Sequence, residues 1–491
     1  MTVGLLVAAA LGQVAAMPVR DWAATARADA KGFHEEVLAS HPGPLNAADP
    51  GFAAREAAAY ARLLRRTAAV RDLASYRFAL KEYVASFDDG HVQFALASEA
   101  GLPTPQWPGF LTGFDGGGRQ RVMTRDPEAL VPLGAELKSC DGVPAATLAA
   151  RNVGAFEGRW ALAAVRATRG GHVLVDRGNP FVRRPVRCAF AVGRAVRQVT
   201  LAWRPLAGAD ALSRRLSEVN GVARPPIGAR TLADGTRWYA MSSFNGAPDS
   251  DAAKALTSLI AGMRADRAAL VQAPAIVLDL RGNGGGSSSW SAQIARLLWG
   301  TERVADARRR EAATYVEWRA SPKVIEAVDT YVRQFSAGGP GAVAFLHVIA
   351  EGLRQAQAAG QPLWREPDAA AATALLQRAG ASGPDPAPPA GPVYVLTDAA
   401  CASACLDAVD LWRALGAVQV GRETSADTFY MEVRSGKLPS GLASYGVPMK
   451  VYRGRARGSN VPWAPQHLYR GAMTDTAALE GWIVSLPERR R

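Results

Sequence analysis

The stretch Ala275-Ile-Val-Leu-Asp-Leu-Arg-Gly-Asn-Gly-Gly-Gly286 decides the fold class of this 491-residue chain. It begins as a continuous apolar run of strand length, which is typical of a strand buried on both faces of a parallel sheet. It ends in three glycines, which let the backbone turn tightly. A second apolar run at 392–397 leads into a helix, and an amphipathic helix is expected at 251–264. Apolar strands that alternate with helices predict an α/β core around a mostly parallel sheet.

Outside this core the hydrophobic pattern of the sequence predicts two further parts. Residues 17–104 carry apolar side chains at helical spacing and predict an N-terminal helical cap. Residues 105–207 hold short alternating strands separated by glycines and predict a small β module. The core is expected over 208–486. It is interrupted at 301–390 by a segment that predicts a helical insertion, because so long a structureless loop is unusual in a compact domain.

Residues 1–16 form a short apolar stretch that ends in small residues, like a secretory signal peptide cleaved near Ala16. No lysine or arginine precedes the apolar run, so a buried N-terminal helix or a mis-assigned start is the alternative interpretation. The run is too short for a comfortable membrane span, and no later segment qualifies. The signal interpretation predicts a periplasmic or secreted protein.

The net charge of +13 comes mostly from arginines that are scattered along the chain. No basic stripe is interleaved with aromatic residues, and no zinc-finger or helix-turn-helix spacing occurs, so nucleic-acid binding is not expected. No two cysteines form a CxxC pair. We therefore expect neither a metal nor a cofactor.

The four cysteines are too few for a disulfide scaffold, but one bridge suits an exported protein. Cys140 and Cys188 both lie on predicted strands of the small module, and we expect them to be bonded. Cys401 and Cys405 lie one helical turn apart, where a bridge would strain the backbone. We expect both of these to be reduced.

Two segments directly follow buried strands, where the sites of α/β sheets collect. The glycine triplet 284–286 either leaves N–H groups free to hold an anion or oxyanion, or is only a flexible turn. After the second strand, Ser403 stands among small residues near the start of a helix. The helix N-terminus favours negative charge developing beside it, although a serine there is also a common helix cap.

Taken together, the two segments resemble those of one peptidase family. Residues 279–286 are similar to the D-x-R-x-N-x-G-G signature of the tail-specific serine peptidases and their tricorn-like and retinoid-binding relatives. Residues 395–404 resemble the strand and nucleophile elbow of that family, and Val420-Gly-Arg-Glu-Thr424 resembles its next strand. The resemblance covers most of the chain outside 301–390. It implies a clip-like, crotonase-related β/α core.

The cap and the module fit the same resemblance. The stretch 133–148, with its Asp141-Gly142 turn, is similar to a stretch of PDZ domains, with Ala135-Glu136 where Gly-Asp usually stands. The family order is a helical cap, then a PDZ-like module, then the core. We therefore expect a PDZ-like fold for 105–207.

The resemblance also implies roles for single residues. Ser403 is the expected acylated nucleophile, with the N–H groups of Ala404 and Gly285 as the oxyanion hole. Tail-specific members use a lysine base after the serine, but Asp427 stands at that place, so a Ser–Lys pair is disfavoured. Tricorn-like members use an N-terminal histidine instead, which corresponds to His91. Imidazole suits a general base because its ordinary pKa lies near neutral pH.

This chain departs from the tricorn-like pattern around the base. Gly90 stands where the family has a serine, and 457–465 offers no clear glutamate. Asp89, Asp88 or Asn460 is therefore expected to orient the imidazole. A turn histidine packed on the cap is the alternative reading of His91. The second choice of base is His41, and the histidines expected to be incidental are His34, His172, His347 and His467.

The leading expectation is a serine endopeptidase that cleaves peptides or unfolded proteins through an acyl-enzyme on Ser403. One alternative is a non-catalytic binding protein on the same scaffold, which would present a nonpolar groove. The other is a thiol hydrolase that uses Cys401 or Cys405, although buried packing cysteines are the simpler interpretation.

Overall fold

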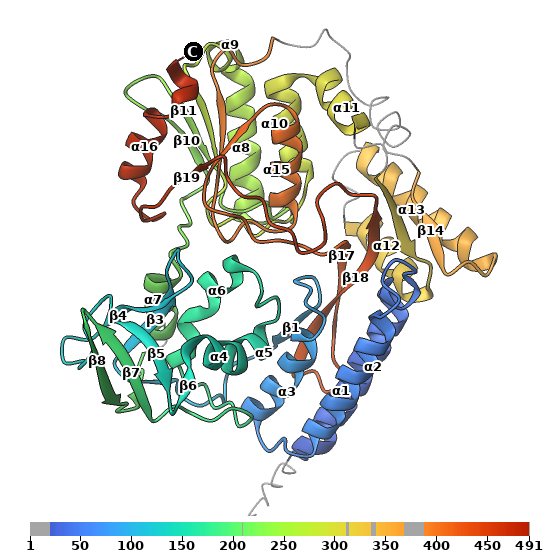
Figure 1. Ribbon diagram of the computed structural model, residues 1–491. Helices are drawn as coiled ribbons and strands as arrows, with labels where there is room; N and C mark the ends of the chain where they lie inside the picture. The colour runs from blue at the N-terminus through green and yellow to red at the C-terminus, as the bar shows by residue number, and fades with distance from the viewer. Residues whose placement is uncertain (1–19, 209, 311–313, 335–339, 368–386, 491) are drawn as a thin grey trace, which may run out of the picture.

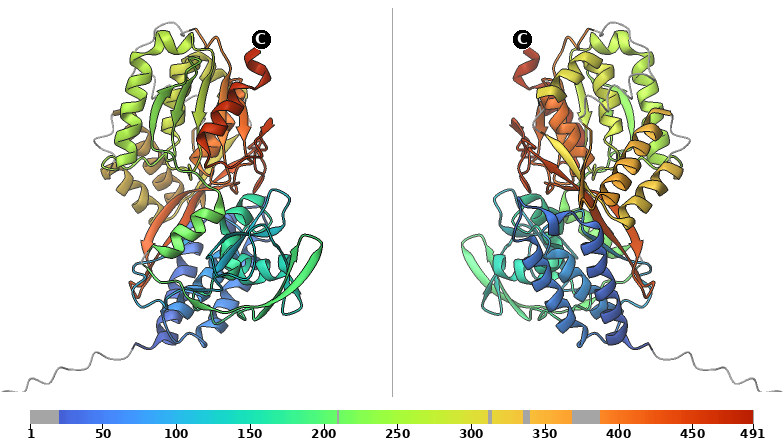
Figure 2. Two further views of the ribbon diagram at one scale, coloured as in Figure 1. Left: turned by 90° about the vertical axis from the view of Figure 1, so that its left-hand side faces the viewer. Right: turned by 90° about the vertical axis from the view of Figure 1, so that its right-hand side faces the viewer.

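The computed structural model describes residues 20–208, 210–310, 314–334, 340–367 and 387–490. The predicted signal segment at 1–16 lies outside these residues. The N-terminal helices and the β module form the lower part of the molecule, and the parallel sheet forms the upper part (Figure 1). In both side views the orange C-terminal strands run down from the upper part to the blue helices (Figure 2). Within the described ranges, no helix is long and apolar enough to cross a membrane.

Three helices form the cap, α1 (Trp22–Ser40), α2 (Phe52–Thr67) and α3 (Leu73–Ala85). Asp21 and Asp72 cap α1 and α3 by accepting a backbone N–H from the first turn. The buried face of these helices includes Phe33 and Leu80, which pack in one cluster with Tyr445. The cap thus shares its hydrophobic core with the C-terminal part of the chain.

An antiparallel sheet forms the module, in agreement with the predicted short strands. Its order is β3 (Phe110–Phe114), β4 (Gln120–Arg125), β5 (Glu136–Cys140), β7 (Arg187–Val192) and β8 (Ala195–Thr200), with β6 (Val143–Pro144) paired to β5. Cys140 and Cys188 face each other across β5 and β7 with a Cα–Cα distance of 4.0 Å, and the predicted disulfide is confirmed. The arrangement is consistent with a PDZ-like module, which stays a prediction.

A six-stranded sheet forms the core, and its fold class confirms the predicted α/β architecture. Its order is β10 (Gly228–Thr231), β11 (Arg237–Ala240), β12 (Ile276–Asp279), β15 (Val393–Thr397), β16 (Val418–Gly421) and β19 (His467–Leu468). The neighbours are parallel from β11 onward. The strands β12 and β15 are buried along their whole length, which is why their sequences read as continuous apolar runs.

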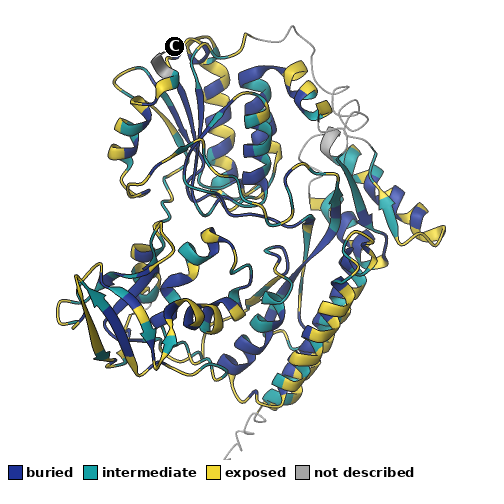
Figure 3. Cartoon of the chain, in the orientation of Figure 1, coloured by how far each residue is buried: buried dark blue, intermediate teal, exposed yellow. Residues whose placement is uncertain are grey.

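Helices cover both faces of this sheet (Figure 3). One face packs against α8 (Asp251–Ala265), α10 (Ser289–Trp299) and α15 (Ala404–Ala414). The other face packs against α16 (Thr476–Val484) through Leu479 and Ile483. Buried residues line the centre of the upper part, and exposed residues lie on the outer faces of its helices (Figure 3).

The sequence predicted a helical insertion at 301–390, but its described part also contains strands. It contains α11 (Thr301–Arg310), α12 (Pro322–Gln334) and α13 (Pro340–Ala358), but also β13 (Tyr315–Arg319) and β14 (Leu363–Arg365). These strands join a second sheet of order β1-β18-β13-β14, to which β17 (Tyr430–Lys437) adds by pairing with β18 (Ala443–Arg453). The cap supplies β1 (Gln93–Leu96) to the same sheet. Pairing partners so distant in sequence leave no local signal, so the strands went unpredicted.

Candidate active site

The two segments singled out in the sequence begin where β12 and β15 end. The strands are parallel neighbours, so their carboxyl ends lie at one edge of the sheet. The loops that follow come into contact there. A Cβ atom on Gly285 would lie only 2.6 Å from the Cβ of Ser403. Glycine at this position therefore allows the loop to approach the serine closely.

The charged and amide side chains of the first motif hold the loop in shape. Arg281 and Asp279 are fully buried, with Arg281 Nη2 2.6 Å from Asp279 Oδ2. Asn283 donates to the carbonyl oxygen of Met241 at 2.8 Å and accepts the N–H of Gly285 at 2.8 Å. Buried groups of this kind are costly unless every partner is in place. The D-x-R-x-N part of the motif thus acts as an internal brace.

The same brace changes the choice of oxyanion donor. The N–H of Gly285, the expected donor, is engaged with Asn283. The N–H of Gly286 donates to no hydrogen-bond acceptor within the described part of the chain, and the residue lines the cleft beside Ser403. The N–H of Ala404, the first residue of α15, is also unpaired among the described residues, as early helix N–H groups are. Gly286 therefore replaces Gly285 as the candidate donor beside Ala404.

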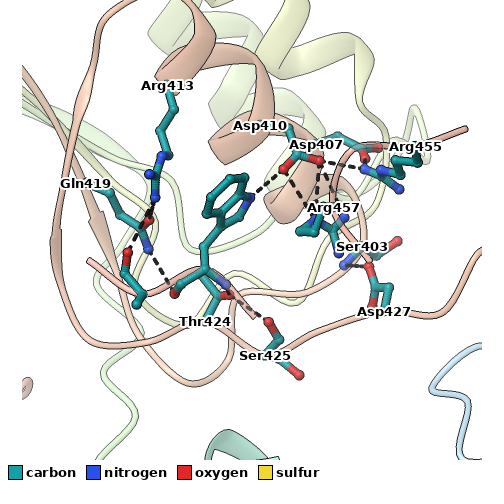
Figure 4. Close-up of polar contacts among 12 residues, drawn as sticks. Ser403, Asp407, Asp410, Arg413, Gln419, Thr424, Ser425, Asp427, Arg455 and Arg457 are labelled. Carbon is teal, nitrogen blue, oxygen red and sulfur yellow. Dashed lines mark hydrogen bonds and ion pairs between the residues drawn. The ribbon is translucent and has the colours of Figure 1, made fainter. Parts of the chain in front are cut away.

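Ser403 occupies the position just before α15 with φ 56° and ψ −127°. A non-glycine residue at positive φ is uncommon and is often found at functional sites. Its N–H donates to Asp427 Oδ2 at 2.6 Å, which ties the strained backbone to the segment after β16. Figure 4 shows this carboxylate beside the backbone of Ser403. In the sequence analysis Asp427 was noted only because it stands where tail-specific peptidases have their lysine base, so its contact with Ser403 was not predicted.

Ion pairs between α15 and the loop after β18 fix the helix that begins directly after Ser403 (Figure 4). Arg455 pairs with Asp407 and lies 2.7 Å from Asp410 Oδ2. Arg457 and the indole N–H of Trp463 also reach Asp410. Because these side chains are largely buried, the pairs hold the start of α15 firmly relative to its surroundings.

Cys401 and Cys405 form a disulfide, so the prediction that both are reduced is wrong. That prediction assumed a continuous helix through both cysteines. The helix begins only at Ala404, and the turn at Ser403 brings the two Cα atoms to 5.3 Å, within the usual range for a disulfide. The bridge joins the residues two positions before and two positions after Ser403, and both cysteines are fully buried.

His91 lies directly opposite Ser403, although 312 residues separate them in sequence. Its Nε2 is 3.3 Å from Ser403 Oγ, close to the range of about 2.6–3.2 Å expected for a general base and loose as such contacts are without substrate. Its Nδ1 is 3.4 Å from Asp89 Oδ1, which is ion-pair distance but not a well-aligned hydrogen bond. Asp89 is fixed in turn, because its carboxylate accepts hydrogen bonds from the backbone N–H of His91 and from the Thr428 hydroxyl, each at 2.8 Å.

The buried carboxylates set the proton affinity of this group. Burial of the imidazole opposes its protonation, but Asp89 outweighs that effect, so the pKa of His91 lies above its ordinary value. Burial likewise opposes ionisation of Asp89, but His91 outweighs it and lowers the pKa of Asp89. Burial raises the pKa of Asp427, which lies near the imidazole. Both shifts in pKa favour a protonated His91 imidazole beside an ionised Asp89 carboxylate.

The two contacts of His91 thus link the Ser403 hydroxyl through the imidazole to the Asp89 carboxylate. Residues 240–450, which contain both loops of the core, match the profile of peptidase family S41. Over these residues the chain is similar to the S41 peptidases. It is accordingly a serine peptidase. No curated protein sequence matches the chain.

The overall fold of the chain is similar to that of mature CPAF. A structure of mature CPAF complexed with lactacystin has a TM-score of 0.58 at 12% identity, over 94% of this chain and 98% of that one. A crystal structure of mature CPAF has a TM-score of 0.55 at 11% identity, over 91% and 92% of the two chains. At these identities the likeness concerns the fold alone.

The other two candidates for orienting the imidazole, Asp88 and Asn460, lie further from it than Asp89 does. Asp88 accepts the backbone N–H of Arg159. Asn460 donates its side-chain amide to the Asp88 carbonyl oxygen at 2.8 Å and its backbone N–H to the Asp427 carbonyl oxygen at 2.7 Å. It joins the two segments that carry the base and the carboxylate, but it does not contact His91.

The second-choice base, His41, is a buried packing residue of the cap. It stacks on Phe52 with 4.6 Å between ring centroids, and its Nδ1 accepts the N–H of Gly43. Burial lowers the pKa of His41 to about 4. Its imidazole contacts the cap and the C-terminal strands rather than the serine.

A cleft of about 360 Å³ surrounds Ser403 and His91. Polar and charged side chains contribute to its wall, among them Arg159 and Asp427. Arg159 was missed in the sequence because it lies in the β module, far from either motif. Within the described ranges, no group of three or more histidine, cysteine or acidic residues could hold a metal ion.

Proposed function

We propose that this serine peptidase is an endopeptidase that forms an acyl-enzyme on Ser403, with His91 as the general base. The observation that carries the proposal is the 3.3 Å distance between His91 Nε2 and Ser403 Oγ. In the first step Nε2 takes the hydroxyl proton as Oγ attacks the peptide carbonyl carbon. The imidazolium then gives that proton to the departing amine. Water attacks the ester with the same base, which restores both residues.

The negative oxygen of the tetrahedral intermediate needs fixed donors. Free N–H groups on Gly286 and Ala404 supply two, and the start of α15 adds the positive end of a helix dipole. Asp89 stabilises the imidazolium that forms during the reaction, since its carboxylate lies 3.4 Å from Nδ1. Each component thus acts where charge appears in the transition state.

Two features disfavour the alternatives. The wall of the cleft includes charged side chains such as Arg159, Asp427 and Lys450, whereas a lipid-like carrier would present a nonpolar groove. The disulfide of Cys401 with Cys405 leaves neither sulfur as a free thiolate, and the thiolate is the nucleophile in a thiol hydrolase.

Fluorophosphonate labelling of the whole protein tests the proposal. We expect one label, on Ser403, and loss of both label and peptide hydrolysis in Ser403→Ala. The control is Ser217→Ala, at an exposed helix serine, which should label like the wild type. Label on another residue, or equal labelling of Ser403→Ala, would overturn the assignment of the nucleophile.

We also propose that the protein is exported and acts on peptides or unfolded proteins in an oxidising compartment. The apolar segment at 1–16 and two disulfides support this. N-terminal sequencing of protein purified from its producing cells should begin near Met17. Thiol titration of that protein should find no free cysteine, and intact residues 1–16 with four free thiols would contradict export.

A further inference from the structure

A second, larger cavity of about 1000 Å³ lies beside the catalytic cleft. It lies between α3, the strand β1 and the β module, with residues of α5 (Ala155–Glu157) and α7 (Ala211–Asn220) in its wall. The two spaces share Gly90, Gln93 and Arg159 in their walls. A chain that occupies the cavity can therefore continue directly to Ser403.

Positive charge exceeds negative charge around the larger cavity. Two of the lining carboxylates are each shared by two cations. Glu157 pairs with Lys81 and, at 3.7 Å, with Arg169. Glu99 lies 3.2 Å from Arg77 and 3.4 Å from a second arginine, Arg177. The Glu99 side chain is 65% exposed, so solvent screens these contacts and they hold the arginines weakly.

The remaining acidic group of the lining, Asp89, is committed to His91 and Thr428. Burial in this cavity disfavours the charged forms of two of its basic side chains. Burial lowers the pKa of Arg177, and the neighbouring Arg77 lowers it further. Burial also lowers the pKa of Lys81. A carboxylate bound in this space would relieve both effects.

Arg159 stands where the two spaces meet, and its backbone N–H donates to the Asp88 carboxylate. Its Nη1 donates to the carbonyl oxygen of Ala426 at 2.7 Å, which fixes the guanidinium. No carboxylate lies within ion-pair distance of it among the described residues, and its guanidinium packs against Gly90, the residue before the base. Its backbone has φ 47°, unusual for a side chain of this size. A planar guanidinium held in this way is suited to bind a carboxylate.

The strand β1 offers backbone pairing along the same path. It pairs with β18 through one edge only in the described structure, and Gln93, Phe94 and Ala95 line the larger cavity. In an antiparallel pair, alternate residues direct their N–H and C=O groups away from the partner. An extended chain can therefore add to β1, whose first residue is two positions after His91.

We propose that the larger cavity is a substrate-binding subsite that selects extended peptide chains with carboxylate groups near the scissile bond, and that Arg159 is its main anion receptor. The inference rests on the proposed function, because it concerns the substrates of the same nucleophile. The carboxylates that it selects are those of aspartate and glutamate side chains of the substrate.

The test uses internally quenched peptide pools of matched random sequence, one with aspartate and glutamate and one with asparagine and glutamine at the same positions. Each pool is made with a free and with an amidated C-terminus. We expect kcat/KM for the acidic pool to exceed that for the amide pool by about tenfold or more, and the preference to fall at high salt. A preference that follows the free C-terminus and not the acidic side chains would overturn this inference.

Arg159→Gln should bring the pools close to parity, mainly by raising KM for the acidic pool. The matched control, Arg151→Gln, changes an exposed arginine of the module that does not line the cavity and should keep the preference. Equal cleavage of all wild-type pools, with Ser403 still labelled by fluorophosphonate, would overturn this inference alone. Absence of both labelling and cleavage would overturn the proposed function instead. The wild-type comparison is decisive even if Arg159→Gln does not fold.

Discussion

Replacing Asp89 by asparagine tests the electrostatic part of the mechanism. The substitution keeps the shape of the side chain and removes its charge. The amide oxygen can still accept the His91 N–H, and the Thr428 hydroxyl can turn to accept from the amide nitrogen, since each now lies 2.8 Å from a carboxylate oxygen. The fold should therefore persist, while the imidazolium formed during catalysis loses its counter-charge.

The size of the effect follows from the distance. At 3.4 Å between His91 Nδ1 and Asp89 Oδ1, Coulomb's law with an effective dielectric constant of about 20 gives an attraction of about 5 kcal/mol. Desolvation of the two buried groups offsets part of it. We expect the barrier to rise by about 3–4 kcal/mol, which corresponds to a loss of about 10²–10³-fold in kcat.

The pH profile gives an independent readout. The base must be neutral, so wild-type activity should rise with pH through the pKa of His91, which Asp89 holds above its ordinary value. In Asp89→Asn that pKa falls, so the rising limb of kcat/KM should move to lower pH while the plateau drops. The matched control is Asp88→Asn, because Asp88 contacts Arg159 and not the imidazole. Wild-type kcat with an unshifted limb in Asp89→Asn would refute the reasoning.

Three further substitutions test the framework of the site. Gly285→Ala should lower kcat by about 100-fold or more, because its Cβ would lie 2.6 Å from that of the nucleophile, whereas Gly284→Ala meets open space and should retain activity. Equal kinetics of the two variants would refute the close approach. Replacing Cys401 and Cys405 together by serine should lower the free energy of unfolding by about 2 kcal/mol and slow fluorophosphonate labelling. An unchanged labelling rate would show that the bridge does not hold the nucleophile. Asp279→Ala should cost about 3–5 kcal/mol of stability in chemical denaturation, because it leaves a buried guanidinium unpaired. A loss below about 1 kcal/mol would mean that the pair is not a brace.

The parts of the fold that could be predicted are those whose sequence pattern is local. The strand β12 reads as a continuous apolar run because both of its faces are covered, and α8 was predicted to within a residue of its end. The pairing of Cys140 with Cys188 followed from two strands of one small module. The Ser403 loop and the glycine triplet could be expected at one place because each follows a buried strand of the parallel sheet.

The parts that could not be predicted depend on contacts across the chain. The pairing of β1 and β13 with β18 joins segments far apart in sequence and leaves no periodicity to detect. The engagement of Gly285 with Asn283 is a detail of loop geometry that a glycine triplet does not reveal. Arg159 belongs to the module, and only the folded chain places it beside Gly90.

The joining of β1 to β18 has a consequence for the order in which the protein is made. The nascent chain carries His91 early, but Ser403 is translated 312 residues later, and β18, which pairs with the cap strand β1, is later still. Bringing such distant segments together carries a large loop-closure entropy, so this step comes late in folding. A ribosome-bound or truncated chain that ends before β18 therefore lacks the strand pairing that holds the cap, and with it His91, against the part of the chain that carries Ser403.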